Sequence, residues 1–268
     1  MSNTTFKEIL SSLEQFYTDN ALKFFIPSLK KYVMFKPLSI DQQKRFLDLQ
    51  PQNNQFDEAD FADIYDGVLK EACTEDIDID ALATVDRAVL ALQHRADMDP
   101  KLMLDLDDDI IEVDVSDYIA QAKKTKLPAF KKVLTHKGIK VQLQLPTLKQ
   151  DRIYNNLSKD AVNYHDEITA EQLEKAVKTS VSELAILAAS KYIAYIEVDK
   201  KRVSSSDINP SEFFLLIKSL PGNFLKKMVE FLPNLRKMEA DPVTLSQKVG
   251  TSSRRVSITI NSVLFTGL

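Results

Sequence analysis

The sequence is poor in the residue types that build cross-links and cofactor sites. Among 268 residues it has one cysteine, five glycines, three histidines and no tryptophan. A single cysteine, Cys73, cannot form an internal disulfide, and this is typical of a protein from a reducing compartment. So few glycines argue against the glycine-rich loops that bind dinucleotides. We therefore expect no cofactor.

Long apolar runs are missing as well. No stretch reaches the roughly 20 residues that a membrane span requires, and the longest candidate, 181–196, is interrupted by Ser, Glu and Lys. The first ten residues lack a basic start followed by an apolar run, so we expect no signal peptide. Apolar residues still make up 44% of the chain, enough for a packed core. We expect a cytoplasmic protein with no membrane partner.

Charge is unevenly spread along the chain. Residues 57–117 carry 20 acidic and 4 basic side chains, whereas residues 118–152 carry 9 basic and 1 acidic. The simpler interpretation is two solvated faces, and the sharper one is that a face docks a partner electrostatically. The basic segment 118–152 also supports an alternative function as a nucleic-acid or replication accessory protein. Tyr118 and Phe130 do not interleave with its lysines as a stacking platform would, so we consider nucleic acid an unlikely partner.

Patterns that would bind metal or activate a nucleophile fail when tested. Asp105, Asp107 and Asp109 have the spacing of calcium-loop ligands, but Ile110 replaces the required glycine and Ser116 the closing glutamate. The three histidines are far apart, so zinc is not expected. Cys73 is interpreted as a small core residue, with a Cys–His nucleophilic pair as the alternative. We expect no metal, no small-molecule substrate and no catalytic residue.

The stretch 22–49 predicts a strand, a turn at Lys30–Lys31, a second strand and a capped helix. Ser39 or Asp41 can cap this helix, and Ile40, Phe46 and Leu47 are expected to face inward. Before it, apolar residues at helical spacing predict a helix over 5–17, which either packs on the body or lies against a neighbour.

The remaining pattern predicts an α+β fold with antiparallel hairpins. Expected helices cover 56–73, 82–95, 148–157, 169–189, 210–220 and 223–232. Hairpins over 102–118 and 130–145 are expected to join in one small sheet spanning 102–146, and further strands cover 191–198 and 256–260. We predict a mixed hairpin and helix domain over 1–146 and a mostly helical domain with a C-terminal strand over 147–268.

Three polar residues stand out on the expected helix 82–95. Asp86 lies near its start, and His94 and Arg95 lie near its end. Cations near a helix C-terminus interact favourably with the helix dipole, so capping is the first interpretation. A buried pairing of Asp86 with Arg95 that orients the helix is the alternative.

Four short motifs resemble one known family. They are the hairpin and capped helix at Tyr32–Ser39, the helix from Thr84-Val85-Asp86 to Gln93-His94-Arg95, the strand Ile139–Pro146, and a C-terminal region with Pro233-Asn234-Leu235 before the apolar Val263-Leu264-Phe265. The order of these motifs resembles the baseplate hub assembly proteins of T4-like contractile-tailed bacteriophages. Many members carry Cys-x-x-Cys pairs in two regions where this chain has none. The resemblance therefore implies that its small β modules are stabilised by alternating apolar residues instead of zinc.

The resemblance implies a structural or chaperone-like assembly protein of the tail baseplate hub, made late in infection and without enzymatic activity. It would act in the host cytoplasm, and also in the virion, by contacts with other baseplate or tail hub proteins. We expect those contacts at an acidic hairpin, a basic segment and an apolar C-terminal tip, and packing of this tip on the protein itself is the alternative. The candidate residues are Asp105, Asp107, Asp108, Asp109, Lys123, Lys124, Lys131, Lys132, Leu264 and Phe265.

Overall fold

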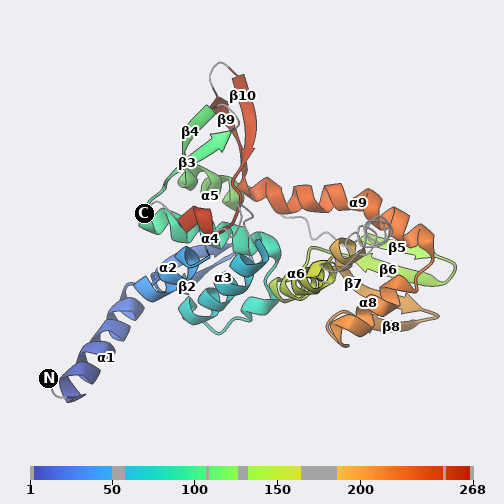
Figure 1. Ribbon diagram of the computed structural model, residues 1–268, viewed down its shortest axis with the longest axis horizontal. Helices are drawn as coiled ribbons and strands as arrows, with labels where there is room; N and C mark the ends of the chain where they lie inside the picture. The colour runs from blue at the N-terminus through green and yellow to red at the C-terminus, as the bar shows by residue number, and fades with distance from the viewer. Residues whose placement is uncertain are drawn as a thin grey trace. The chain divides into compact units, whose positions relative to one another are not determined.

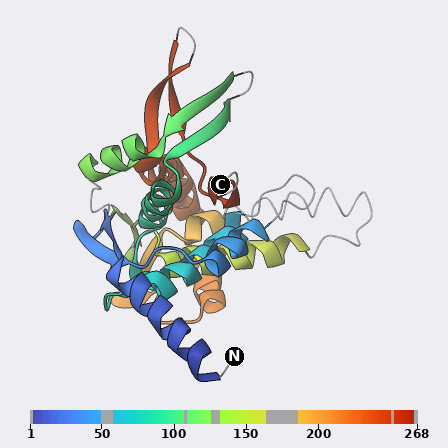
Figure 2. The ribbon, with the colours of Figure 1, turned by 90° about the vertical axis from the view of Figure 1, so that its left-hand side faces the viewer.

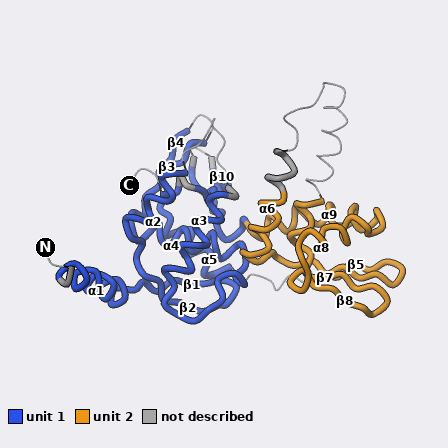
Figure 3. The backbone as a smooth tube through the Cα atoms, turned by 60° about the horizontal axis from the view of Figure 1, so that its bottom comes forward, with its two compact units in different colours: residues 1–126, 240–268 blue, residues 127–239 orange. Residues whose placement is uncertain are grey.

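The chain folds into two compact units of helices and small antiparallel sheets, which confirms the predicted α+β class (Figure 3). The computed structural model describes residues 3–49, 58–106, 109–125, 132–163, 186–249 and 252–265. Unit 1 contains residues 1–126 and 240–268, and unit 2 contains residues 127–239. Unit 1 is therefore built from both ends of the sequence.

Unit 1 begins with a helix and a hairpin. These are α1 (Asn3–Asp19), β1 (Leu22–Ile26) and β2 (Lys31–Phe35), followed by α2 (Ile40–Leu47) (Figure 1). The strands pair antiparallel, with Leu22 opposite Phe35. The turn falls at 27–30, with Lys30 at a φ of 52°, so it begins three residues and ends one residue before the predicted turn. Ser39 caps α2 in a reciprocal capping box with Gln42, as its hydroxyl suggested.

The core of unit 1 lies against two longer helices. These are α3 (Glu58–Ala72) and α4 (Thr84–Met98), with the short 3-10 helix η1 (Ile79–Ala81) between them. The end of β2 continues as a bridge to the residue after α3, where Phe35 pairs with Cys73. The Cys73 thiol donates to the carbonyl of Glu75 at 3.3 Å, and partial burial raises its pKa.

The rest of unit 1 consists of two hairpins and the short elements around them. In chain order these are β3 (Lys101–Leu106), β4 (Asp109–Asp114), α5 (Val115–Lys124), η2 (Asp241–Val243), β9 (Thr244–Val249), β10 (Ser252–Ser257) and η3 (Ser262–Phe265). Each hairpin is a separate two-stranded antiparallel sheet. Figures 1 and 2 draw the two hairpins beside each other, β3–β4 in green and β9–β10 in red.

Unit 2 is organised around a four-stranded antiparallel sheet, in which β5 (Lys132–His136), β6 (Ile139–Leu143), β7 (Ile193–Val198) and β8 (Lys201–Ser204) pair in that order. Its apolar face packs with Phe213, Phe224 and Met228 into one buried cluster. Two hairpins, β5–β6 and β7–β8, make up this sheet, and they join where β6 pairs with β7 although residues 144–192 separate the two strands. The described helices of this unit are α6 (Leu148–Asn163), α8 (Pro210–Lys218) and α9 (Gly222–Ala240).

Several sequence expectations differ from this arrangement. Residues 102–146 do not form one sheet, because β3–β4 and β5–β6 belong to different sheets and different units. The unit boundaries consequently differ from 1–146 and 147–268. Helix α5 replaces the end of the predicted first hairpin, and α9 continues through Pro233. Most of the predicted helix 169–189 lies outside the described residues.

Two predicted core residues of α2 are also wrong. Ile40 is 84% exposed and Leu47 is 47% exposed, whereas Phe46 is fully buried as expected. The capping box begins the helix at Ile40, so this residue occupies the first helical position and its side chain lies on the solvent side. A single buried aromatic, rather than an apolar stripe, anchors α2.

Candidate functional site

Helix α4 carries an unusual set of buried polar and charged side chains. Asp86, Gln93, His94 and Arg95, which include the polar residues of the second sequence motif, are all buried, as is Arg87. Polar groups that leave water must recover their hydrogen bonds inside the protein. The partners of these five residues therefore show what the helix holds in place.

Asp86 fastens the turn of the first hairpin to the start of α4. One carboxylate oxygen accepts the Ser28 backbone N–H at 2.9 Å, and the other accepts the Ser28 hydroxyl and the Ala83 backbone N–H. Burial raises the pKa of Asp86, and the hydrogen bonds from Ser28 and Ala83 oppose that rise. The carboxylate thus serves both as a helix cap and as an anchor for the β1–β2 turn.

Gln93 extends the hairpin ladder by a side chain. Its Oε1 accepts the backbone N–H of Phe25 at 2.8 Å, and its Nε2 donates to the carbonyl of the same residue at 2.9 Å. Both polar groups of a β1 residue are therefore paired by one amide, as a neighbouring strand would pair them. This contact aligns β1 along α4.

His94 lies in an aromatic cage made by three elements. Its ring packs edge-on against Phe24 and Phe35 of the hairpin and Tyr65 of α3. The Tyr65 hydroxyl hydrogen-bonds Nδ1 at 2.6 Å, while Nε2 has no hydrogen-bond partner among the described residues. Burial lowers the pKa of His94 to about 3, so the ring is neutral at pH 7. A neutral, caged imidazole is a packing element rather than a helix cap.

The alternative pairing of Asp86 with Arg95 is wrong. The two residues are nine positions apart on one helix, which separates them by about 13 Å along its axis. Arg95 instead donates through Nη2 to the carbonyl of Lys101 and to Asp99, next to the start of β3. Burial lowers its pKa, and its Nε and Nη1 have no partner among the described residues.

The buried ion pair that joins α3 to α4 is Asp66 with Arg87, which the sequence reasoning missed. Arg87 Nε lies 2.7 Å from Asp66 Oδ1, and Nη2 lies 2.8 Å from Oδ2. Both side chains are almost fully shielded from water. Such a two-point contact fixes the angle between guanidinium and carboxylate, and hence between the two helices. Nothing in the spacing of the two residues distinguishes them from surface charges.

The candidate C-terminal contacts Leu264 and Phe265 lie in the core of unit 1, at 1% and 2% exposure. The Phe265 ring stacks on Phe46 with ring centres 4.7 Å apart and also contacts Phe61 and Tyr65. Leu264 and Phe265 therefore pack on their own unit, and these two residues offer no surface to a partner in this structure.

The candidate acidic hairpin is β3–β4, whose outer face mixes acidic and apolar side chains. Met103 is 60% exposed and Ile110 is 70% exposed. Asp105 stands directly opposite Ile110, and Glu112 opposite Met103, so the four share one face. Asp109 is exposed at the tip, whereas Asp107 and Asp108 lie outside the described residues. Leu102 and Val113 occupy the buried face.

The candidate basic residues belong to two different units. Lys123 and Lys124 are exposed on α5 of unit 1, and Lys132 is exposed on β5 of unit 2. Lys123 Nζ lies 5.6 Å from the centre of the Tyr32 ring, and Lys132 Nζ lies 5.3 Å from that of Phe231. Lys131 lies outside the described residues. Lys123 and Lys132 are thus each in contact with an aromatic ring of their own unit.

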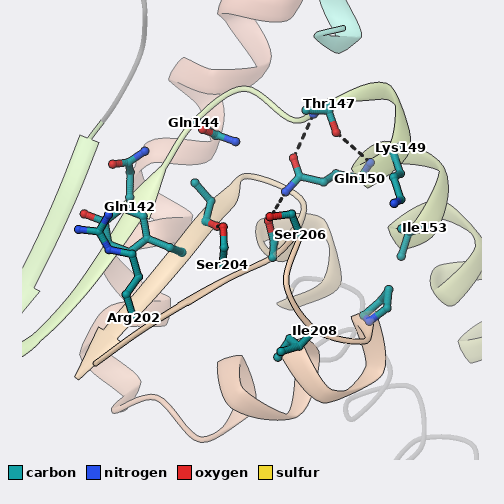
Figure 4. Close-up of a pocket in the computed structure, with 14 residues that line it drawn as sticks. Gln142, Gln144, Thr147, Lys149, Gln150, Ile153, Arg202, Ser204, Ser206 and Ile208 are labelled. Carbon is teal, nitrogen blue, oxygen red and sulfur yellow. Dashed lines mark hydrogen bonds between the residues drawn. The ribbon is translucent and has the colours of Figure 1, made fainter. Parts of the chain in front are cut away.

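Unit 2 contains a polar cavity of about 560 Å³, lined by β6, β7, β8 and the start of α6 (Figure 4). Gln150 bonds Thr147 in a capping box and donates to the Ser205 hydroxyl. Arg202 lies 3.9 Å from the centre of the Tyr195 ring and bonds Glu197. The described lining residues include no His, Cys, Asp or Glu. Thr147, Gln150 and Ser205 thus bond one another, while the Ser206 hydroxyl donates to the neighbouring Asp207, which is not a lining residue.

Within the described ranges, no group of three or more His, Cys, Asp or Glu side chains is arranged to hold a metal ion. Among the helices that the structure describes, none is both long enough and apolar enough to cross a bilayer.

Comparison with protein families matched residues 19–259 to the family described as T4 bacteriophage base plate protein. The match begins at the last residue of α1 and continues to just beyond β10, so it covers both units. Searches of curated proteins and of solved structures found no match.

Proposed function

The chain belongs to the T4 bacteriophage base plate protein family, and on that premise we propose that it is a structural or assembly protein of the baseplate hub that acts through protein–protein contacts. Family membership supports a structural protein of the phage tail baseplate. We further propose that the protein belongs to the hub, acts in a chaperone-like way, is made late in infection, assembles in the host cytoplasm and has no enzymatic activity.

The observation that carries the proposal is the outer face of the β3–β4 hairpin. Its cross-strand pairs put exposed Met103 and Ile110 beside Asp105 and Glu112. Exposed apolar side chains within a charged rim are the composition of a protein contact surface. Glu112 is paired with Lys101 at 2.9 Å, so the carboxylates of Asp105 and Asp109 are the ones that accelerate the approach of a basic partner. The apolar side chains contribute the contact area. The expected partner surface is a basic face with an apolar centre, on another baseplate or tail hub protein.

The alternative, nucleic-acid binding through segment 118–152, requires its lysines to form one continuous track. Lys123 and Lys132 belong to different compact units, and each lies over an aromatic ring of its own unit. No observation favours this alternative, and we propose no nucleic-acid, membrane or small-molecule partner.

The test is capture of hub proteins by charge-reversed variants. The protein is co-expressed with the hub proteins of the same tail, and the captured partner is measured. Asp105→Lys with Asp109→Lys should lower capture at least tenfold, because the acidic rim then repels a basic partner. Met103→Ser with Ile110→Ser should weaken capture without changing its dependence on salt.

A matched control reverses two exposed acidic residues of unit 2, Asp207→Lys with Glu230→Lys. It makes the same change in net charge but leaves the hairpin intact, so capture should be retained. Equal capture by the hairpin variant and the control would contradict the proposed contact surface. Failure of every hub protein to bind the unaltered chain would contradict the hub assignment.

A further inference from the structure

Helix α1 presents an apolar face that nothing in the described structure covers. Its large apolar side chains Phe6, Ile9, Leu10, Leu13 and Phe16 are all between 45% and 61% exposed. The helix has 17 residues, and most of the stability of a helix in a protein comes from packing of its apolar face. A further contact is therefore needed to give α1 the packing that other helices obtain within their unit.

The spacing of this face is that of a two-helix seam. Phe6, Ile9, Leu13 and Phe16 are separated by three, four and three residues, the alternation of the a and d positions of a heptad. In this frame Leu10 and Tyr17 are e positions, and Ser12 and Asp19 are g positions. The seam is therefore two heptads long.

The same four residues are symmetric about Ser11. When two copies of α1 are placed antiparallel and centred there, Phe6 meets Phe16 of the other copy and Ile9 meets Leu13. Large aromatic residues then fill both ends, and branched aliphatic residues fill the middle. A two-fold interface requires self-complementarity of this kind, because the same surface of both copies is in contact. If one residue contacts a second residue of the other copy, that second residue contacts the first in return.

The flanks of the seam also accept a second copy. Across the two-fold axis Leu10 faces Leu10 on one side and Ser12 faces Ser12 on the other. The first flank therefore adds apolar contact, and the second carries only small side chains that do not hinder the approach of the helices. The charged residues Lys7, Glu8 and Glu14 lie at b and c positions, away from the seam. No like charges oppose each other there, and antiparallel helix dipoles attract.

We propose that α1 forms an antiparallel two-helix coiled coil with α1 of a second copy of this chain. The occupant is a second copy because the seam is uncharged and symmetric, whereas a groove on a different partner would not require symmetry. Helix α1 lies almost entirely before the family match at residues 19–259, so this inference does not rest on the proposed hub function. The seam residues Phe6 to Phe16 span only about 15 Å along the helix axis, which predicts a weak dimer that forms and dissociates with concentration.

The first experiment measures the mass of the full chain by analytical ultracentrifugation over a hundredfold range of concentration. The unaltered chain should shift from monomer to dimer, and Ile9→Glu should weaken the dimer at least tenfold. Ser11→Glu is the matched control, because it adds the same charge on the opposite side of the helix and should leave the mass unchanged. A monomer at every concentration, or a dimer that Ile9→Glu does not weaken, would overturn the proposal.

The second experiment distinguishes antiparallel from parallel pairing by oxidation of single-cysteine variants. In a Cys73→Ser background, Ser12→Cys should form a disulfide-linked dimer, since the two Ser12 residues face each other across the axis. Ile9→Cys should not form one, because Ile9 faces Leu13 of the other copy in the antiparallel arrangement. Only in a parallel arrangement would Ile9 face Ile9 of the other copy. Cross-linking of Ile9→Cys without cross-linking of Ser12→Cys would refute the antiparallel geometry.

Discussion

Helix α4 buries polar and charged side chains, whereas helix α1 leaves large apolar side chains in water. Both belong to unit 1, and each departs from the usual pattern of an amphipathic helix in the opposite sense. The polar groups of α4 contact the β1–β2 hairpin, α3 and the start of β3. The apolar groups of α1 contact no comparable set of described residues. One helix organises the interior of the unit, and the other is available to a second molecule.

This difference indicates how to separate folding defects from contact defects. Changes on α4 should lower the free energy of unfolding because they disturb several elements together. Changes on α1 should alter association and leave that free energy almost unchanged. The predictions below test this division, beginning with the largest effect.

The buried ion pair should give the largest loss of stability. Arg87→Ala removes both guanidinium hydrogen bonds from the buried Asp66 carboxylate, and breaking such a pair costs about 3–5 kcal/mol. Urea unfolding followed by circular dichroism measures the loss. The control is Lys70→Ala, which removes a half-exposed pair with Asp80 and should cost less than about 1 kcal/mol. Equal losses for the two variants would contradict the structural role assigned to α4.

The caged histidine should make stability fall in mild acid. The pKa of His94 is lowered to about 3 in the folded protein, against about 6.5 for an exposed histidine. Between these values the unfolded chain binds the proton and the folded chain does not. Stability is therefore complete above pH 6.5 and declines by about 1.4 kcal/mol per pH unit below it.

Urea unfolding between pH 7.5 and pH 5 measures this slope. The comparison variant is His94→Leu, which packs in the cage but does not titrate. Its lower stability at neutral pH is unimportant, because only the change with pH is compared. The unaltered chain should lose more stability on acidification than the variant, and parallel pH profiles would rule out a buried neutral histidine.

The smallest effect is expected for polar substitution on α1. Leu13→Gln replaces an exposed apolar residue and should change the free energy of unfolding of dilute monomer by less than about 0.5 kcal/mol. Val89→Gln is the contrasting change, because Val89 is fully buried on α4 and should cost about 3 kcal/mol or more. A large loss at Leu13 in dilute solution would mean that α1 is part of the unit core.

Local signals in the sequence predicted much of the secondary structure. A cap at Ser39 or Asp41 predicted the start of α2, and the structure uses Ser39. Alternating apolar residues predicted the strands of β3–β4 and β5–β6. Helix α5 was missed because Val115 prolongs the alternation of β4. The available signal was Asp114 as an N-cap, followed by buried residues at helical spacing.

Long-range pairing explains the remaining differences. The sequence does not indicate that β6 pairs with β7 rather than joining β3–β4 in one sheet. It also does not indicate that Arg87 reaches Asp66, because many acidic side chains of segment 57–117 are equally plausible partners. Of the candidate contact residues, the acidic hairpin was recognisable from its turn and alternation. The burial of Phe265 depends on Phe46 and Phe61, which are some two hundred residues earlier.

Because Phe265 completes the aromatic cluster of unit 1, this unit cannot finish folding during synthesis of its first 126 residues. The nascent chain must wait until residues 240–265 leave the ribosome, by which time all of unit 2 has already emerged. A nonsense codon near residue 260 would therefore damage the half of the molecule that was translated first.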